Sequence, residues 1–342
     1  MKNTQPLVCI CIPTFNSENT IRQTIESLLL QKYKNIKIKI VDNYSTDSTI
    51  GIVKTFRDSR IELHQFNTVV PVDGSFNRCL SLFDGDYSAI FHADDLYLPE
   101  ILSEQVNYLE MNPGAGAVFT EAILINNAGK KIGQITLPAG MTINRKPYDF
   151  IFIFKKIMRH YNFIVCPSAL VRTSIYKNEI REWDGQKFRS SADLDVWLRI
   201  LQRHSIGFLG PLIKYRISLM QETELVRKNL DRSDFFSVID YYLSFEQVRN
   251  KITQSDLQSY KWLELRDKLR RYINLISIGE DIPPEKLIGD IWHLKSITSA
   301  FNSRQGLSTL FFGSFIMLSS LFFSKAYSKY LILKTAKILK MN

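Results

Sequence analysis

Short apolar runs alternate with amphipathic, helix-like segments over residues 7–120, and this alternation restricts the fold more than any other feature. Strand-like runs are predicted at 7–12, 36–41, 61–64, 87–91 and 117–120, with helix-like stretches between most of them. Repeated β-α-β units of this kind form a mostly parallel sheet with helices on both faces. The sequence therefore predicts an α/β domain.

Polar side chains follow three of the predicted strands. Asn16, Asp42 and Asp94 each come after a strand-like run. In open α/β sheets, ligands bind outside the carboxyl ends of the strands. We therefore expect these three residues, which are far apart in sequence, to converge on one edge of the sheet.

Acidic residues at this edge suit a metal-bound phosphate, although each has a structural alternative. Asp94 and Asp95 could hold a hard divalent ion that bridges to the oxygens of a nucleoside diphosphate. Asp42 could accept hydrogen bonds from a base or a ribose. Acids at these positions are equally typical of helix caps, and the residues alone leave both interpretations open.

A third acid, Asp193, stands at the start of a predicted helix. The apolar stripe that follows consists of Leu194, Trp197, Leu198 and Leu201, and Asp195 is expected on another face. An ionised carboxylate in this position could accept the proton of an incoming hydroxyl, or it could simply cap the helix.

Several blocks of sequence, taken in order, resemble family 2 glycosyltransferases. The blocks are V-C-I-C-I-P-T-F-N at 8–16, S-L-L-L-Q-K-Y at 27–33, V-D-N-Y-S-T-D-S-T at 41–49, D-Y at 86–87 continuing to F-H-A-D-D at 91–95 with Pro99, D-L-D-V-W-L-R at 193–199, and Y-R at 215–216. They cover roughly residues 7–217. The resemblance implies the GT-A nucleotide-diphospho-sugar transferase fold, an inverting displacement, a nucleotide-sugar donor and a divalent metal, usually Mn²⁺ or Mg²⁺.

The resemblance also implies roles for individual residues. Asp193 would be the catalytic base and Asp94 the metal ligand. The donor site would be formed by Pro13, Thr14, Asn16, Asp42, Asn77, Arg78 and Asp95, with Asp42 on the base, commonly uracil, and Asp95 beside the sugar or ribose. His92 replaces the first aspartate of the D-x-D motif; we expect it to be a hydrogen-bonded structural histidine, with a metal ligand or a phosphate contact as the alternative. Ala192 replaces the acid that usually precedes the base.

The C-terminal part of the sequence has a different character. We expect a catalytic domain at 1–221, a helical extension at 222–302 and membrane-associating helices at 303–342. No acidic residue follows Asp290, and lysines punctuate the last apolar segments. This pattern favours an amphipathic anchor on anionic lipid over a buried helical pair. It would suit a lipid-linked or surface-glycan acceptor.

The polar N-terminus predicts that the chain begins in the cytoplasm, and the four cysteines, which lack metal-ligand spacing, indicate a reducing compartment. Together with the C-terminal anchor, these features predict a cytoplasmic protein at the inner face of the membrane. Other function classes lack their sequence signals. A nucleotidyltransferase would carry a glycine-rich basic loop after the first strand, and a dehydrogenase would carry G-x-G-x-x-G there. A nucleic-acid-binding protein is compatible with the net charge of +10, but the most one-sided charge lies in the tail. A non-catalytic nucleotide- or glycan-binding protein on the same fold stays an alternative.

Overall fold

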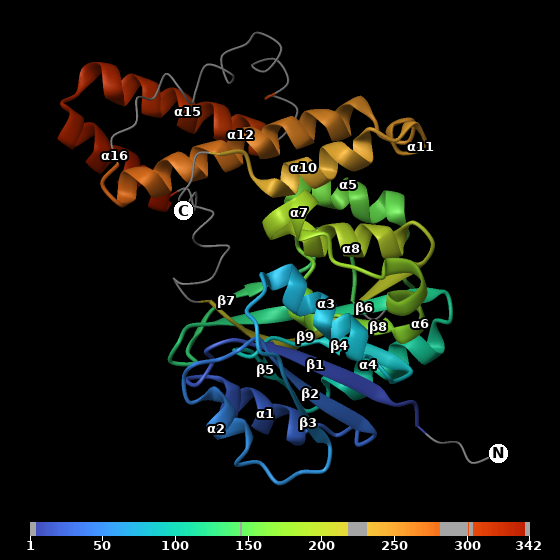
Figure 1. Cartoon of the computed structure of the whole chain (residues 1–342). Helices are drawn as coiled ribbons and strands as arrows, with labels where there is room; N and C mark the ends of the chain where they lie inside the picture. Colours follow the sequence, from blue (N-terminus) through green and yellow to red (C-terminus); the bar gives the residue numbers. More distant parts are fainter. Residues whose placement is uncertain (1–4, 144–145, 218–230, 281–299, 301–303, 339–342) are drawn as a thin grey trace. The chain divides into compact units, whose positions relative to one another are not determined.

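The computed structural model describes residues 5–143, 146–217, 231–280, 300 and 304–338. These residues form two compact units (Figure 1). Unit 1 contains residues 1–153 and 162–218, and unit 2 contains residues 154–161 and 219–342. The domain boundaries expected from the sequence, at 221/222 and 302/303, lie outside the described residues.

Unit 1 is built on one sheet of nine strands in the order β3-β2-β1-β4-β8-β6-β9-β5, with β7 paired to β6. The strands are β1 Val8–Thr14, β2 Ile36–Asp42, β3 Ile61–Gln65, β4 Tyr87–Ile90, β5 Leu96–Tyr97, β6 Ala115–Ile125, β7 Lys131–Ile135, β8 Leu170–Arg172 and β9 Ser205–Arg216. The predicted strands are all present, and the α/β fold is confirmed.

The sheet has a parallel half and a mixed half. Strands β3, β2, β1 and β4 are all parallel, and the register pairs Thr14 with Asp42, so the ends of β1 and β2 lie level. Strand β8 then pairs antiparallel with β4 and β6, while β6 and β9 run parallel. The parallel half is what brings the loops after β1, β2 and β4 to one edge.

Helices cover both faces of the sheet (Figure 1). Those of unit 1 are α1 Ile21–Leu29, α2 Thr49–Val53, α3 Val72–Leu82, α4 Ile101–Met111, α6 Thr173–Ile175, α7 Gly185–Phe188 and α8 Ala192–Leu201, while α5 Phe150–His160 crosses from unit 1 into unit 2. Short 3₁₀ turns occupy Cys166–Ser168 and Arg189–Ser191, and a π-turn occupies Tyr176–Ile180.

Two hydrophobic layers hold the sheet between these helices. Apolar residues of α1, α2 and α4, among them Ile25 and Leu102, share one core with strand residues such as Ile10 and Ile38. On α8, the predicted stripe is buried, and Trp197 makes an edge-on ring contact with Phe119 of β6. The stripe predicted from i, i+3, i+4 spacing is therefore the face that docks α8 on the sheet.

Helices α1 and α2 begin at Ile21 and Thr49, each four residues after a serine, Ser17 and Ser45. The Ser17 carbonyl accepts the N–H groups of Thr20 and Ile21, so a turn precedes α1. The Ser45 hydroxyl accepts the N–H of Asn16 in the neighbouring loop at 3.0 Å. Both serines therefore shape the loops at the sheet edge instead of capping helices.

Unit 2 is helical. Its remaining helices are α10 Asp234–Leu243, α11 Glu246–Arg249, α12 Gln254–Ser277, α15 Arg304–Phe322 and α16 Lys325–Ile338. Helices α12, α15 and α16 share an apolar core that includes Tyr272, Phe312 and Ile332. Among the helices that the structure describes, none combines the length and apolar character that crossing a bilayer requires.

Candidate active site

The loops after β1 and β2 are tied together by their own polar side chains. The side-chain oxygen of Asn16 accepts the N–H of Thr46 at 2.9 Å, and the backbone of Asn16 adopts a φ of 47°. The backbone N–H of Asn43 donates to the Thr14 carbonyl at 2.8 Å. Because the two loops share these bonds, they form one preorganised rim at the sheet edge.

Asp42, the last residue of β2, is buried next to these two loops. Both of its carboxylate oxygens accept the N–H of Ser45, at 3.3 and 3.1 Å. Thr14 beside it is buried, Pro13 is half-buried and Asn16 is exposed. The predicted nucleotide residues thus gather where β1 and β2 end. Asp42 also closes the turn to Ser45, and its role in nucleotide binding stays a prediction.

Asn77 and Arg78, both on α3, make structural contacts around the same edge. The Asn77 side chain exchanges two hydrogen bonds with the backbone of Trp183, at 3.1 and 2.7 Å. Arg78 donates to the side-chain oxygen of Asn43 at 2.7 Å and stacks over the Phe66 ring. These contacts position the surrounding loops, and the donor-binding role given to both residues stays a prediction.

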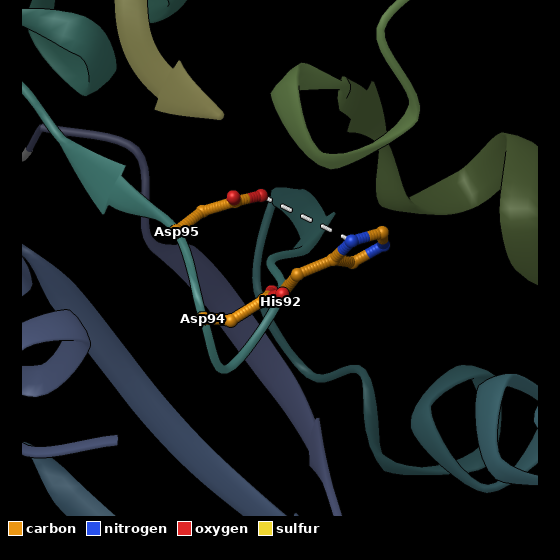
Figure 2. A group of neighbouring side chains, drawn as sticks. All are labelled: His92, Asp94 and Asp95. Carbon is orange, nitrogen blue, oxygen red and sulfur yellow. Dashed lines mark ion pairs between the residues drawn. The ribbon is translucent and has the colours of Figure 1, made fainter. Parts of the chain in front are cut away.

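Three potential metal ligands meet in the loop between β4 and β5 (Figure 2). His92, Asp94 and Asp95 each offer one ligand atom, and these atoms lie within 4.8 Å of one another. The His92 Nδ1 and the Asp95 Oδ2 are 4.0 Å apart. The loop therefore presents an imidazole and two carboxylates to one small volume, a donor set that suits a divalent cation.

Asp95 is fully buried, and burial together with the charge of Asp94 raises its pKa well above the usual range. Its Oδ1 accepts the backbone N–H of Arg216 at 2.8 Å, whereas its Oδ2 has no hydrogen-bond partner in the described part of the chain. An unpartnered buried carboxylate oxygen is costly unless a cation or donor supplies the missing interaction.

The hydrogen bonding of His92 differs from what the sequence predicts. Its backbone N–H donates to the Tyr97 hydroxyl at 2.8 Å, but its ring Nε2 is buried without a hydrogen-bond partner among the described residues. The side chain as a whole remains 26% exposed, and burial lowers the pKa of the ring. The expectation of a hydrogen-bonded structural histidine is thus wrong at Nε2. The neutral ring could instead offer a nitrogen to a ligand.

Arg216, at the end of β9, holds this loop from behind. Its guanidinium donates to the Asp94 carbonyl at 2.8 Å and to the carbonyls of Asn126 and Asn127 at 3.0 and 2.8 Å. The side chain is almost completely buried. Arg216 therefore fixes the acidic loop through both its backbone and its side chain.

Asp193 opens α8, as predicted, and is half-buried. Burial raises its pKa to about 6, against a smaller opposing effect of the N–H groups of Leu194 and Asp193. Its neighbour Asp195 instead forms an ion pair with Arg199 at 2.8 Å and is buried. The two acids of one helix turn thus have different environments, and Asp193 has the raised pKa of a proton acceptor.

Tyr215 and Cys166 connect Asp193 with the acidic loop. Burial and then the negative charges of Asp95, Asp94 and Asp193 raise the pKa of Tyr215. Burial, Asp193 and Asp95 likewise raise the pKa of Cys166. Ring contacts from His92 to Phe76, from Phe76 to Trp183 and from Trp183 to Trp197 link the acidic loop to α8. No role was predicted for either residue, although Tyr215 stands one position before Arg216 in the Y-R block.

The family profile described as "Glycosyl transferase family 2" matches residues 9–179 of this chain. This span contains β1 to β4 and the acidic loop, and it ends before α8. The match thus covers the nucleotide side of the site but not Asp193.

Two named relatives extend the likeness. EpsE of Bacillus subtilis (strain 168), named as a glycosyltransferase, is 28% identical over 74% of this chain and 86% of its own length. The Escherichia coli protein WfaP, named UDP-Glc:alpha-D-GlcNAc-diphosphoundecaprenol beta-1,3-glucosyltransferase, is 38% identical, over 30% of this chain and 41% of its own length.

Solved structures agree on the fold. TarS of S. aureus superimposes with a TM-score of 0.55 at 16% identity and covers 83% of this chain and 50% of TarS. TarS 1-349 in complex with UDP gives 0.51 at 17% identity and covers 80% of this chain and 83% of that one. The mannosyltransferase PcManGT of Pyrobaculum calidifontis, solved with GDP-Man and Mn²⁺, gives 0.50 at 14% identity over 99% of this chain and 82% of its own.

Proposed function

The chain belongs to glycosyl transferase family 2, and from this we propose that it moves a sugar from a nucleoside-diphosphate donor to an acceptor hydroxyl with inversion at the anomeric carbon. The observation that carries the proposal is the acidic loop with its three potential metal ligands, which a series of ring contacts links to α8, the helix that carries Asp193. A donor diphosphate needs the metal ligands, and an acceptor hydroxyl needs a base.

Asp193 is the proposed general base. In the transfer step, the acceptor oxygen forms a bond to the anomeric carbon while the bond from that carbon to the diphosphate oxygen breaks. Asp193 takes the hydroxyl proton, and the nucleoside diphosphate leaves with the bonding electrons. A carboxylate with a pKa of about 6 is mostly ionised at neutral pH, yet it is more basic than an ordinary aspartate.

The residues present fit a divalent cation. One ring nitrogen of His92 and one carboxylate oxygen each of Asp94 and Asp95 lie within 4.8 Å of one another, and the Asp95 Oδ2 has no hydrogen-bond partner among the described residues. When bound, Mn²⁺ or Mg²⁺ would neutralise the diphosphate and stabilise it as a leaving group. Arg216 keeps the loop backbone in place, and the buried Asp95 would be the residue whose charge depends most on the cation.

Asp42, Thr14, Pro13 and Asn16 form the proposed nucleoside side of the donor site, and we place Asn77 and Arg78 behind it. A uridine nucleotide is the proposed donor, because WfaP is named for a UDP-sugar donor and TarS was solved with UDP. The named WfaP acceptor is a lipid diphosphate, and we propose a lipid-linked glycan acceptor and work at the inner face of the membrane.

A thermal-shift panel tests the proposal. UDP, GDP, CDP and dTDP are each added with and without Mn²⁺, because a ligand that binds only the native state raises its stability. We expect UDP to raise the melting temperature only when Mn²⁺ is present. No shift with any of the four nucleotides would refute the donor site.

A further inference from the structure

We infer that the outer face and turn of the α15–α16 hairpin dock on an anionic phospholipid surface. This contact rests on the proposed function, which places the protein at the inner face of the membrane, and it names the surface that binds there; it involves no residue of the active site and can be measured without transfer. The surface, here called the hairpin face, consists of Leu307, Phe311, Leu318, Leu321, Phe322, Phe323, Tyr327 and Tyr330, each between 41% and 75% exposed.

Helix α15 is apolar on two sides, and unit 2 uses only one of them. Phe312 and Ile316 are completely buried in the core shared with α12 and α16. Phe311 and Leu318, on the other side of the same helix, are 64% and 52% exposed. Among the described residues of unit 2, the shared core contains the first stripe and not the second, and contiguous exposed apolar patches mark interaction sites.

Exposure is greatest where the hairpin turns. Leu321 and Phe322 end α15 and are 68% and 75% exposed, and Phe323 follows in the turn at 48%. The Phe323 ring contacts Tyr327, which in turn contacts Tyr330. Aliphatic and phenyl groups at a tip, with tyrosines set back from them, match the depth order of a membrane interface, where tyrosines sit at the headgroup level.

The positive charge around the hairpin face favours an anionic partner. Lys334 and Lys337 are exposed on α16, and the Lys334 ammonium lies 5.7 Å from the centre of the Tyr330 ring. No acidic residue follows Asp290 in the sequence. A second copy of the hairpin face would therefore bring cations against cations, whereas an anionic bilayer supplies the opposite charge.

The helix lies on the bilayer and does not cross it. Helix α15 has 19 residues, about 28 Å of helix. Its other side is occupied by α12, and no described helix meets the requirements of a membrane span. One side of α15 is buried in the core of unit 2, so the helix binds the bilayer through its exposed side, at the depth of the membrane interface.

Vesicle flotation of the full-length protein tests this contact. We expect the protein to float with vesicles of phosphatidylcholine mixed with phosphatidylglycerol, to float less with phosphatidylcholine alone, and to be released by salt. Binding that is independent of both anionic lipid and salt would overturn the electrostatic part of the inference.

Paired variants locate the surface. The double variant Leu321→Ser/Phe322→Ser should lower vesicle affinity by at least about tenfold, because each side chain contributes its own apolar burial. The matched control Leu30→Ser/Met111→Ser changes two residues of unit 1 that are 68% and 73% exposed, and it should bind like wild type. Lys334→Gln/Lys337→Gln should weaken binding and flatten its salt dependence.

The readouts separate this inference from the proposed function. All variants should keep the wild-type circular dichroism spectrum and the nucleotide-dependent thermal shift, because the changed side chains are exposed. Unchanged vesicle binding by Leu321→Ser/Phe322→Ser would overturn the inference. A change only in oligomeric state by light scattering, with flotation unchanged, would assign the hairpin face to self-association and equally overturn it.

Discussion

Replacing Asp193 with asparagine tests the proposed base while keeping the shape of the side chain. The asparagine amide cannot accept the acceptor's proton, so the transfer rate should fall by about 100-fold to 10,000-fold, the usual contribution of a general base. Donor binding should hardly change, because the acidic loop and the rim formed by Asn16 and Thr46 are untouched. The variant therefore separates chemistry from donor binding.

The raised pKa gives the same test a pH axis. The pKa of Asp193 is about 6, because burial disfavours its charged form. Only the ionised form can act as a base, so activity is retained above this pH and is lost as the pH falls through it. In wild type, kcat/KM should drop by about tenfold for each pH unit below the pKa. An unperturbed aspartate would place this limb about two units lower.

Release of the nucleoside diphosphate, measured in a coupled assay with donor and acceptor, gives both rates. Asp195→Asn is the matched control, since it makes the same chemical change two residues away on the same helix. It should lower stability by about 2 kcal/mol through loss of the ion pair with Arg199, and the limb near pH 6 should persist. Strong residual transfer by Asp193→Asn, or an acid limb that persists in it, would refute the reasoning.

Two further changes test the supports of the fold. Arg216→Met should lower the free energy of unfolding by about 3 kcal/mol, because the buried guanidinium is lost and three backbone carbonyls lose their donor. It should also weaken Mn²⁺-dependent nucleotide binding; a urea titration and the thermal-shift panel measure the two effects. Burial alone would raise the pKa of Asp256, but hydrogen bonds from Thr253 and Arg159 hold this pKa at about 2. The folded pKa lies below the unfolded one, so the stability from Asp256 is present above about pH 4 and is lost as the pH falls toward 2. In urea titrations from about pH 5 to pH 2, Asp256→Asn should therefore lose less stability than wild type.

The strands that carry the nucleotide side were predictable because their signal is local. The run before Asn16 is continuously apolar, and the run before Asp42 alternates isoleucine with lysine; both are almost wholly buried, as strands covered on both faces are. The stripe on α8 was equally clear from its helical spacing. These elements are long enough for periodicity to identify them.

The mixed half of the sheet could not be predicted in the same way. Strands β5 and β8 contain only two and three residues, too few to show a period. Their positions depend on pairing with β9 and with β4 and β6, contacts that are distant in sequence. The placement of Tyr215 beside the acidic loop follows from this pairing, and the local pattern around Tyr215 does not predict it.

The environment of His92 was also beyond the sequence. A histidine after a buried strand is compatible with a satisfied ring or with a ligand. The unpartnered Nε2 and the neighbouring Asp95 become visible only when the loop is folded against Arg216. Burial of side chains in a loop is set by tertiary contacts, and local pattern carries little information about it.

Calorimetric titration of UDP in the presence of Mn²⁺ into wild type, Asp94→Asn and Asp193→Asn tests the central claim most directly. We expect tight, Mn²⁺-dependent binding to wild type and to Asp193→Asn, and weak binding to Asp94→Asn. Equal binding to all three proteins, or loss of binding only in Asp193→Asn, would contradict the division of the site into a metal-bound donor half and a base.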